Sequence, residues 1–371
     1  MTRDSYAVRL YEPELADACD RFARRVWPEH GGRDGAGGNG HATAPPPRVL
    51  FLKGGEVIGH VATVPVRLAV AGRLLNAAWA VGLMVVPEHR SGPIAPLMVK
   101  KLNQTLEIGL TLHVEEAALR VFKGVGWRHL GVIPQYVRVL NARRFVRTFV
   151  PRVEQFCSGR WSWLRKGPTR ISTPVAAFVS VGFAGLAILG TVRRWRVPGA
   201  AVVEERGFDP SYTQLAERVK GKFGVWVFRD QSYLAERYGR RLGAYRLFAC
   251  RADDGLRGYC ILKLRQFERD PRMGDLRMGT IVDCVFDPDE PEVLDSLLQS
   301  AVTKCRRENI DVVFCSASLG KIGQRLRRHA FIPMPGTLNV AFHDRTDTIG
   351  ANVPLGSWHV MRGDSDADAN C

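Results

Sequence analysis

The sequence predicts an α/β protein made of two related halves, each with a mixed, mostly antiparallel central sheet, joined by a basic and apolar helical connector. Three observations support this. The chain has 371 residues, too many for one ordinary core and suited to two domains. Short apolar runs bounded by Gly and Pro alternate with amphipathic stretches up to residue 140. The same order of elements returns, more loosely, from about residue 208.

The first half predicts the order β-α-β-β-β-α-β-α-β. Gly54–Gly55 and Gly72–Arg73 are hairpin signals that separate three strands. Pro87 ends the third strand, and an amphipathic helix follows closely. In order, the predicted elements are strand 6–10, helix 14–26, strands 49–53, 56–71 and 74–86, helix 94–108, strand 110–114, helix 116–124 and strand 132–140.

The second half repeats most of this order. Its predicted elements are helices 212–220 and 231–238, strands 245–251, 257–264 and 278–286, helix 291–306, strand 311–316, helix 322–329 and a strand near 339–342. The segment 31–47, rich in Gly, Ala and Pro, is predicted to be a loop. We therefore predict a first domain at 1–150, a connector at 151–205, a second domain at 206–346 and an acidic tail at 347–371.

The stretch from Val81 to Val99 carries the main functional signal. An apolar strand ends at Pro87, a basic turn containing Gly92 follows, and a helix begins at once. The first N–H groups of a helix have no partner within the helix, and its positive dipole end attracts anions. A strand end can also pair with an extended ligand as an added strand would. The sequence therefore predicts a site for a pyrophosphate with an extended arm. The candidate cofactor-binding residues are Leu83, Met84, Val85, Arg90, Ser91, Gly92, Pro93, Ile94 and Ala95.

This stretch resembles motif A of the GNAT superfamily of N-acyltransferases, whose loop reads Arg/Gln-x-x-Gly-x-Gly/Ala after a Val-x-Pro strand end. The chain matches at Arg90, Ile94 and Ala95 and departs at Pro93, where the family usually has Gly. A second match is Phe122-Lys-Gly-Val-Gly-Trp127, similar to the family's Tyr-x-x-x-Gly-Phe helix end. The resemblance covers residues 5–140 and implies acetyl-CoA, or another acyl-CoA, as co-substrate.

The resemblance implies that an amine attacks the acyl thioester directly, with the N–H near Val85 stabilising the oxyanion. The family's Tyr often protonates the leaving thiolate, but Phe122 cannot. His113 and Glu115 are the candidate catalytic bases, because residues two apart on a strand face the same side. The alternatives are a structural strand histidine and an acid at a helix start. Trp79 and Asn76 could line an acceptor pocket, and core packing is the alternative for Trp79.

The second half lacks such a loop. The corresponding segment, Phe286-Asp-Pro-Asp-Glu-Pro-Glu292, is acidic and would repel a pyrophosphate, so we expect no CoA there. The acids at 364, 366 and 368 resemble only the beginning of a calcium loop, so we expect no metal and a frayed, solvated end. The eight cysteines form no C-x-x-C pair, which favours buried thiols in a reducing compartment.

Charge concentrates in the connector. Residues 143–196 contain eleven Arg or Lys and one Glu, which gives +10 of the chain's net +16. Within it, 174–192 is an uncharged run of 19 residues, close to the length that spans a bilayer. We favour a buried or interface-lying helix over a span, and the 143–196 segment could contact an anionic membrane surface. No nucleic-acid-binding motif accompanies the charge. The N-terminus lacks an apolar signal region, so we expect a cytoplasmic protein that could lie peripherally at the inner face of the membrane.

The favoured function is an N-acetyltransferase of the GNAT type that acts on a small amine or an amino-sugar in a ternary complex. One alternative is a FemAB-like transferase, since FemAB-like proteins pair two GNAT-like halves and pass aminoacyl groups to cell-envelope precursors. The Arg90–Ala95 loop argues against it, because the loop suits CoA. The other alternative is a non-catalytic, membrane-associated binding protein, which Pro93 and Phe122 would fit.

Overall fold

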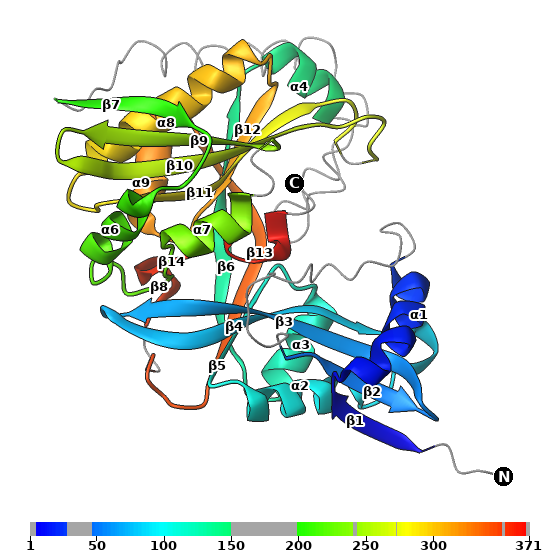
Figure 1. The fold of residues 1–371 in the computed structure, drawn as a ribbon. Coiled ribbons are helices and arrows are strands. Elements are labelled where there is room, and N and C mark those ends of the chain that lie inside the picture. The colour runs from blue at the N-terminus through cyan, green and yellow to red at the C-terminus, as the bar shows by residue number, and fades with distance from the viewer. Residues whose placement is uncertain are drawn as a thin grey trace. The chain divides into compact units, whose positions relative to one another are not determined.

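The computed structural model describes residues 5–27, 47–149, 199–239, 243–271, 273–350 and 353–368 (Figure 1). These residues form two compact units. The first unit contains the described residues up to Ile133, together with Lys220–Phe228 and the described residues from Thr337 onward. The second contains the described residues within Pro134–Val219 and Arg229–Gly336. Each unit therefore draws on separate parts of the sequence.

The first unit is built on a mixed sheet. Its strands run in the order β1 (Tyr6–Leu10), β2 (Val49–Lys53), β3 (Glu56–Val70), β4 (Arg73–Val85), β5 (Ile108–Leu112) and β13 (Ile332–Asp344). Only the β4–β5 pair is parallel, and the other neighbours are antiparallel. The far end of β3 also pairs with the short strand β8 (Val225–Val227), which pairs with β14 (Trp358–His359).

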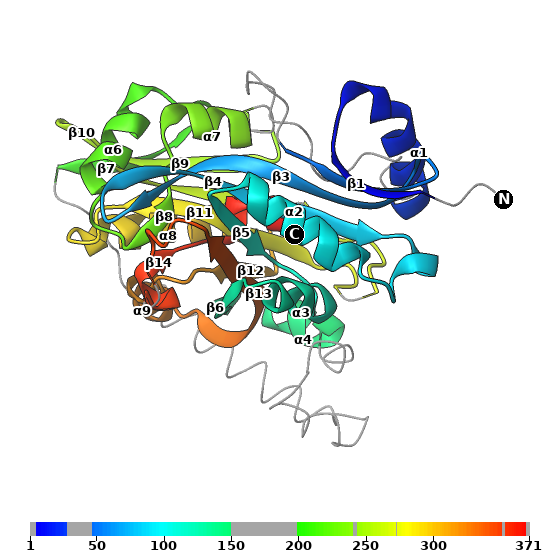
Figure 2. The same ribbon diagram turned by 90° about the horizontal axis from the view of Figure 1, so that it is seen from below.

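Helices cover both faces of this sheet (Figure 2). Helix α2 (Ile94–Thr105) and helix α3 (Glu116–Gly124) lie on one face, and helix α1 (Ala16–Val26) lies on the other. Gly59 has no side chain, which allows α2 to approach the sheet closely. A Cβ at this position would lie only 2.9 Å from the Ile94 side chain. The next residue, His60, points to the opposite face and packs against Phe22 of α1.

The second unit has its own sheet, in the order β7 (Ala200–Glu205), β9 (Tyr245–Ala252), β10 (Gly255–Gln266), β11 (Arg277–Phe286), β12 (Val312–Ser316) and β6 (Arg128–Val139). The β11–β12 pair is parallel, whereas β12 and β6 are antiparallel. Its helices are α4 (Ala142–Phe149), α6 (Pro210–Val219), α7 (Gln231–Tyr238), α8 (Pro291–Arg307) and α9 (Gly320–Arg328). Helix α8 buries one long apolar face, which explains the strong periodicity of that segment.

Strands from distant parts of the sequence complete the two sheets. In the first unit, Val340 to Asp344 of β13 pair with Leu112 to Ile108 of β5. In the second unit, Gln135 to Val139 of β6 pair with Ser316 to Val312 of β12. An early strand thus lies in the later sheet, and a late strand lies in the earlier sheet.

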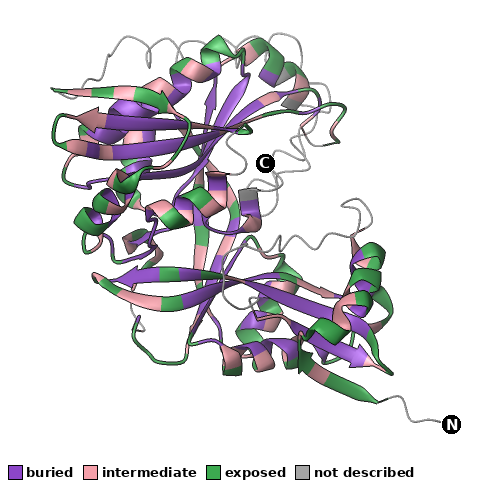
Figure 3. Cartoon of the chain, in the orientation of Figure 1, coloured by how far each residue is buried: buried purple, intermediate pink, exposed green. Residues whose placement is uncertain are grey.

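Buried residues follow the inner faces of both sheets (Figure 3). Helix α2 contributes Met98, Val99 and Leu102, all fully buried, to the core of the first unit. The second unit also buries an ion pair, with Arg229 Nε 3.0 Å from Asp283 Oδ1. Burial raises the pKa of Asp283, although Arg229 and the Tyr238 hydroxyl oppose the rise. None of the described cysteines forms a disulfide, and all except Cys19 are buried, as the sequence predicted.

The predicted fold class is confirmed, and the predicted strands and helices are present with small shifts at their ends. The sequence did not predict α4, β7, β8 or β14. The expectation of a frayed end is wrong for residues 353–368, because Trp358 and Met361 are buried and Asp364 accepts a 2.7 Å bond from the Met361 amide. Residues 31–46 and nearly all of the connector lie outside the described residues. The boundaries of the four predicted segments stay predictions.

Candidate functional site

The turn between β4 and α2 is anchored at both ends and exposed between them. Val85, Val86 and Ile94 are buried, whereas residues 90–93 are exposed. Pro87–His89 form a single 3-10 turn, in which the Arg90 amide donates to the Pro87 carbonyl. Pro87 has no backbone N–H to donate to a neighbouring strand, so the strand ends before it. Ile94 is apolar and buried, so it anchors the start of α2 in the core. All nine candidate cofactor-binding residues therefore lie on one continuous strand end, turn and helix start.

Strands β4 and β5 pair only over a short length. Their parallel ladder joins Ala78 to Gly109 and Trp79 to Leu110, whereas β4 continues to Val85. A β-bulge shifts the register of β4 against β3 between Val81 and Met84, and Gly82 within it has φ +61°. A bulge bends its strand and increases the local twist. The end of β4 therefore diverges from β5, and among the described residues no strand pairs with that edge.

The backbone of Val85 faces this unpaired edge. The Val86 amide donates to the Ile58 carbonyl of β3 at 3.0 Å. Successive residues of a strand direct their N–H and C=O groups to alternate edges, so those of Val85 point away from β3. Arg90 Nε donates to the Val85 carbonyl at 3.0 Å. The Arg90 guanidinium thus lies at the same edge as the Val85 N–H and brings positive charge to it.

The turn presents amide donors. In the described part of the chain, the N–H groups of Ser91, Ile94 and Ala95 have no hydrogen-bond acceptor. Gly92 donates to the His89 carbonyl at 3.3 Å. Pro93 is the N-cap of α2, and Pro96 lies in the first turn of the helix. Because proline has no backbone N–H, the helix start has two fewer donors, and the sequence predicted only the loss at Pro93. Three amides without an acceptor, one guanidinium and a helix start are a combination that suits a phosphate group.

His113 and Glu115 do not lie on a strand as predicted. Strand β5 ends at Leu112, and His113 has φ +60°, outside the extended region. Its amide donates to the Asn339 carbonyl of β13 at 3.2 Å. Glu115 is the N-cap of α3, and its side chain makes no capping bond. The strand-alternation argument for these two side chains is therefore wrong, whereas their catalytic role stays a prediction.

Phe122 and Trp127 are structural. Phe122 is buried in the core of the first unit, with its ring centroid 4.6 Å from that of Trp127. Trp127 Nε1 donates to Asn103 Oδ1 at 2.7 Å, which ties the end of α3 to α2. Of the residues suggested for the acceptor pocket, Trp79 is in the core and Asn76 is exposed.

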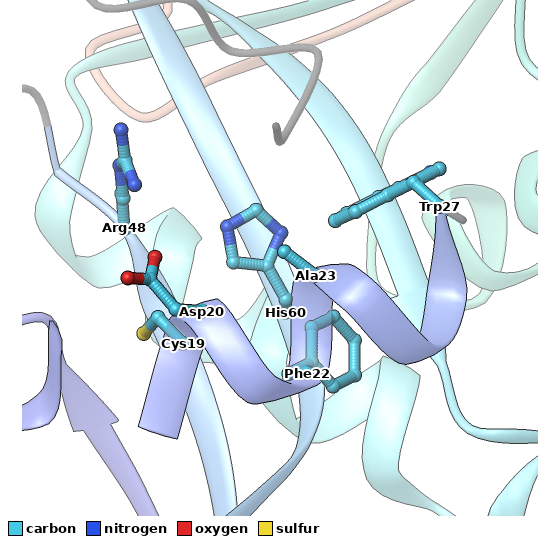
Figure 4. A pocket seen from close by; sticks show the side chains of 7 residues that line it. All are labelled: Cys19, Asp20, Phe22, Ala23, Trp27, Arg48 and His60. Carbon is cyan, nitrogen blue, oxygen red and sulfur yellow. The ribbon is translucent and has the colours of Figure 1, made fainter. Parts of the chain in front are cut away.

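A small cavity lies against β3 on the α1 side (Figure 4). Its volume is about 60 Å³, and it is lined by Cys19, Asp20, Phe22, Ala23, Trp27, Arg48 and His60. His60 Nδ1 lies 3.2 Å from the carbonyl oxygen of Gly82, in the bulge of β4. Sequence reasoning did not select any of these residues. The available signal was His60, a lone basic residue in the otherwise apolar run 57–66.

The acidic segment after β11 is held within the second unit. Asp287 is buried and accepts a 3.0 Å bond from the Asp289 amide, and Glu290 pairs with Arg257 at 2.7 Å. Elsewhere, the described residues contain no group of three metal-ligating side chains and no helix long and apolar enough to cross a membrane. The uncharged run 174–192 lies outside the described residues.

Comparisons with known proteins address the fold. No protein-family model matches the chain, and no curated protein matches it. Among solved structures, a GCN5-related N-acetyltransferase from Anabaena variabilis is similar over 92% of this chain and 73% of its own, with 11% identity and a TM-score of 0.58. Saccharomyces cerevisiae N-myristoyltransferase with bound myristoyl-CoA is similar over 92% of this chain and 83% of its own, with 13% identity and a TM-score of 0.54.

A GCN5-related N-acetyltransferase from Kribbella flavida is similar over 91% of this chain and 71% of its own, at 12% identity and a TM-score of 0.53. At such identities the likeness concerns the fold. It agrees with the mixed sheet of the described residues. The chain therefore has the GNAT-like acyltransferase fold.

Proposed function

We propose that this protein is an acyl-CoA-dependent N-acyltransferase whose cofactor site is the end of β4, the following turn and the start of α2. One observation carries the proposal. In the described part of the chain no strand pairs with this edge of β4 beyond Trp79, and the Val85 N–H on that edge is followed by the amides of Ser91, Ile94 and Ala95, which have no acceptor there. A carbonyl oxygen and a diphosphate would thus both find hydrogen-bond donors on one continuous segment.

Each part of the segment has a distinct task. The amides of Ser91, Ile94 and Ala95, with the Arg90 guanidinium, would bind the diphosphate. The edge formed by Leu83, Met84 and Val85 would pair with the amide groups of the pantetheine arm. The Val85 N–H would then donate to the thioester oxygen, on which negative charge develops during acyl transfer.

The reaction would be direct transfer in a ternary complex. The amine nitrogen bonds to the thioester carbonyl carbon, the carbon–sulfur bond breaks, and the amine loses a proton. His113 and Glu115, at the end of β5, are the proposed acceptors of that proton. The thiolate takes a proton from solvent, which a thiol pKa of about 8.5 permits. We propose acetyl as the acyl group and the amine of a small molecule or an amino-sugar as the acceptor.

The rest of the chain has proposed roles as well. We propose that the halves are tandem GNAT-like domains and that the second binds no CoA, because its segment 287–292 is acidic. We also propose that the protein is cytoplasmic and that the basic segment 143–196 contacts an anionic membrane surface. The exposed side chains of Arg143, Arg144 and Arg147 on α4 support that contact.

The test combines binding with turnover. Acetyl-CoA is expected to raise the thermal unfolding midpoint of the wild-type protein, and Arg90→Glu is expected to abolish that rise. Lys123→Glu, an exposed charge reversal at the end of α3, is the matched control and keeps it. Release of free thiol from acetyl-CoA, measured across a panel of amines, identifies the acceptor. The proposal fails if neither acetyl-CoA nor longer acyl-CoAs stabilise the wild-type protein.

A further inference from the structure

Positive charge gathers at the end of the second unit where β12 begins. Strand β6 ends beside that point, since Val139 pairs with Val312, and α4 follows β6 beside the end of α8 (Figure 1). The end of α9 lies there as well, because Arg138 Nη1 donates to the His329 carbonyl at 2.6 Å. The arginine surface consists of seven exposed residues, Arg143, Arg144 and Arg147 on α4, Arg306 and Arg307 at the end of α8, and Arg327 and Arg328 at the end of α9.

The acidic side chains nearby leave this charge largely in place. Asp311 is buried and lies 3.6 Å from Arg144 Nε, so it offsets one arginine. Glu308 pairs with Lys304 at 3.5 Å, and neither residue belongs to the arginine surface. The β10–β11 loop at the same end, residues 267–276, carries charges of both signs. The arginine surface therefore keeps a large positive excess.

Helix stability explains only part of the arginine surface. Basic residues in the last turn of a helix are favoured by its dipole, which accounts for the arginines of α8 and α9. Arg143 and Arg144 lie in the first turn of α4, which contains no acidic residue. The dipole repels positive charge at that position. The arginines of α4 therefore oppose helix stability, which favours a role outside the fold.

The opposite end of the second unit is acidic. Strands β11 and β12 are parallel, so the segment 287–292 that follows β11 lies at the other end of the sheet from the start of β12. Asp289 and Glu292 are exposed in that segment. The unit thus carries charges of opposite sign at its two ends. A charged surface orients such a unit before any contact forms.

We propose that the arginine surface docks on the anionic phospholipids of a membrane. The start of β12 would then face the bilayer, and the acidic segment 287–292 would face away from it. The inference rests on the membrane contact proposed for segment 143–196, and it adds the ends of α8 and α9. Each arginine held close to an anionic bilayer adds about fivefold to the binding constant.

Two observations favour lipid over nucleic acid. Single-stranded nucleic acids stack their bases on exposed aromatic rings, and no aromatic side chain is exposed among the described residues of the second unit. The sequence that follows α4 also contains the uncharged run 174–192, which suits contact with lipid better than contact with nucleic acid.

Sedimentation of the full chain with vesicles tests the partner. We expect binding to vesicles of phosphatidylcholine and phosphatidylserine that weakens as salt increases, and no binding to phosphatidylcholine alone. Equal binding to the two kinds of vesicle would overturn a docking driven by charge. Tighter binding to duplex DNA than to the mixed vesicles, at the same salt concentration, would overturn the assignment to lipid.

Paired substitutions locate the surface. Arg307→Gln with Arg328→Gln is expected to weaken binding to the mixed vesicles about 10- to 30-fold. Neither side chain makes a hydrogen bond or an ion pair within the described residues, so the pair should fold normally. Arg218→Gln with Lys321→Gln is the matched control, because it removes the same charge from exposed residues near the acidic end. An equal loss in the control would show that binding follows net charge, and the inference would fail.

Further measurements separate this inference from the proposed function. Arg143→Gln with Arg147→Gln tests the contact already proposed for α4. Weaker binding in that pair, together with wild-type binding in Arg307→Gln with Arg328→Gln, would overturn the inference and keep the α4 contact. A wild-type protein that does not bind the mixed vesicles refutes both. The thermal shift with acetyl-CoA should be the same in all these variants, and its absence in the wild type would refute the transferase while the vesicle data still decide the docking.

Discussion

Trp127 donates its indole N–H to the side-chain oxygen of Asn103 at 2.7 Å. The amide nitrogen of Asn103 in turn donates to the Val125 carbonyl at 3.1 Å. Asn103 thereby satisfies two polar groups at the end of α3, and Trp127 is only 4% exposed. A residue on α2 thus fixes the position of α3, and the helix that begins after the turn at residues 87–93 is held at its other end.

Replacing Asn103 by Ala is expected to destabilise the protein by about 1–3 kcal/mol, because the buried indole N–H loses its acceptor. Chemical denaturation measures the change. Asn103→Asp keeps the oxygen that accepts from Trp127 and loses only the bond to Val125, so it is expected to cost less than Asn103→Ala. Equal losses in the two variants would contradict the importance of the indole bond.

Gly59→Ala is expected to weaken acyl-CoA binding without touching the turn. The added Cβ would lie 2.9 Å from Ile94 and 3.0 Å from Met98, so the start of α2 must move away from the sheet. Such overpacking costs about 1–3 kcal/mol. Gly124→Ala is the control, because nothing lies within 4 Å of its Cβ. Titration with acetyl-CoA should show a higher Kd for Gly59→Ala and wild-type affinity for Gly124→Ala.

Gly82→Ala is expected to lower the rate of acyl transfer. Gly82 has φ +61° in the β4 bulge, where a side chain costs roughly 1 kcal/mol. Gly54→Ala introduces similar strain at φ +56° in the β2–β3 turn, with open space around the Cβ. Both variants should lose similar stability, but only Gly82→Ala should lower kcat/KM, by about 10- to 100-fold. A wild-type rate in Gly82→Ala would show that the conformation of the β4 bulge does not affect acyl transfer.

Asp344 is expected to make stability depend on acid pH. Partial burial raises the pKa of this carboxyl, but hydrogen bonds from the amides of Ile349 and Thr346 and from the Thr346 hydroxyl outweigh burial and lower it. A lowered pKa stabilises the fold above the ordinary value of about 3.9, and this contribution is lost as pH falls through the folded-state pKa.

Denaturation of the wild-type protein and Asp344→Asn across this acid range measures that contribution. The variant is expected to be less stable near neutral pH and to lose less stability on acidification. Asp253→Asn changes an exposed carboxylate in the β9–β10 turn and should follow the wild-type curve. Parallel curves for the wild type and Asp344→Asn would show that the charge of Asp344 does not stabilise the segment 344–349.

Much of the fold could be predicted because the sequence marks it locally. Gly54–Gly55 and Gly72 marked the early hairpins, Pro87 marked the end of β4, and the apolar periodicity of α8 matched its buried face. Strand β8 has only three residues, too few to show the alternation of apolar and polar residues that indicates a strand. Strand β14 and the buried end of the chain depend on contacts with residues far away in the sequence.

The candidate site was predictable only in part, for a related reason. The turn after β4 is a continuous segment, so its amides and Arg90 could be selected from their order in the sequence. His113 illustrates the limit, because its positive φ and its bond to Asn339 arise from β13 lying beside β5. The cavity of Figure 4 brings together α1, Arg48 and β3, which a linear pattern does not place side by side.

The exchange of strands between distant parts of the sequence has a consequence during synthesis. Asn339, which bonds to the Val114 carbonyl in the first unit, leaves the ribosome 225 residues after Val114. At translation rates of 5–20 residues per second, this corresponds to a delay of about 11–45 s. Throughout that interval the nascent first sheet carries an open edge at β5, a template for wrong pairing. Slower elongation or a missing chaperone should therefore reduce the yield of folded protein, even though neither changes the stability of the mature protein.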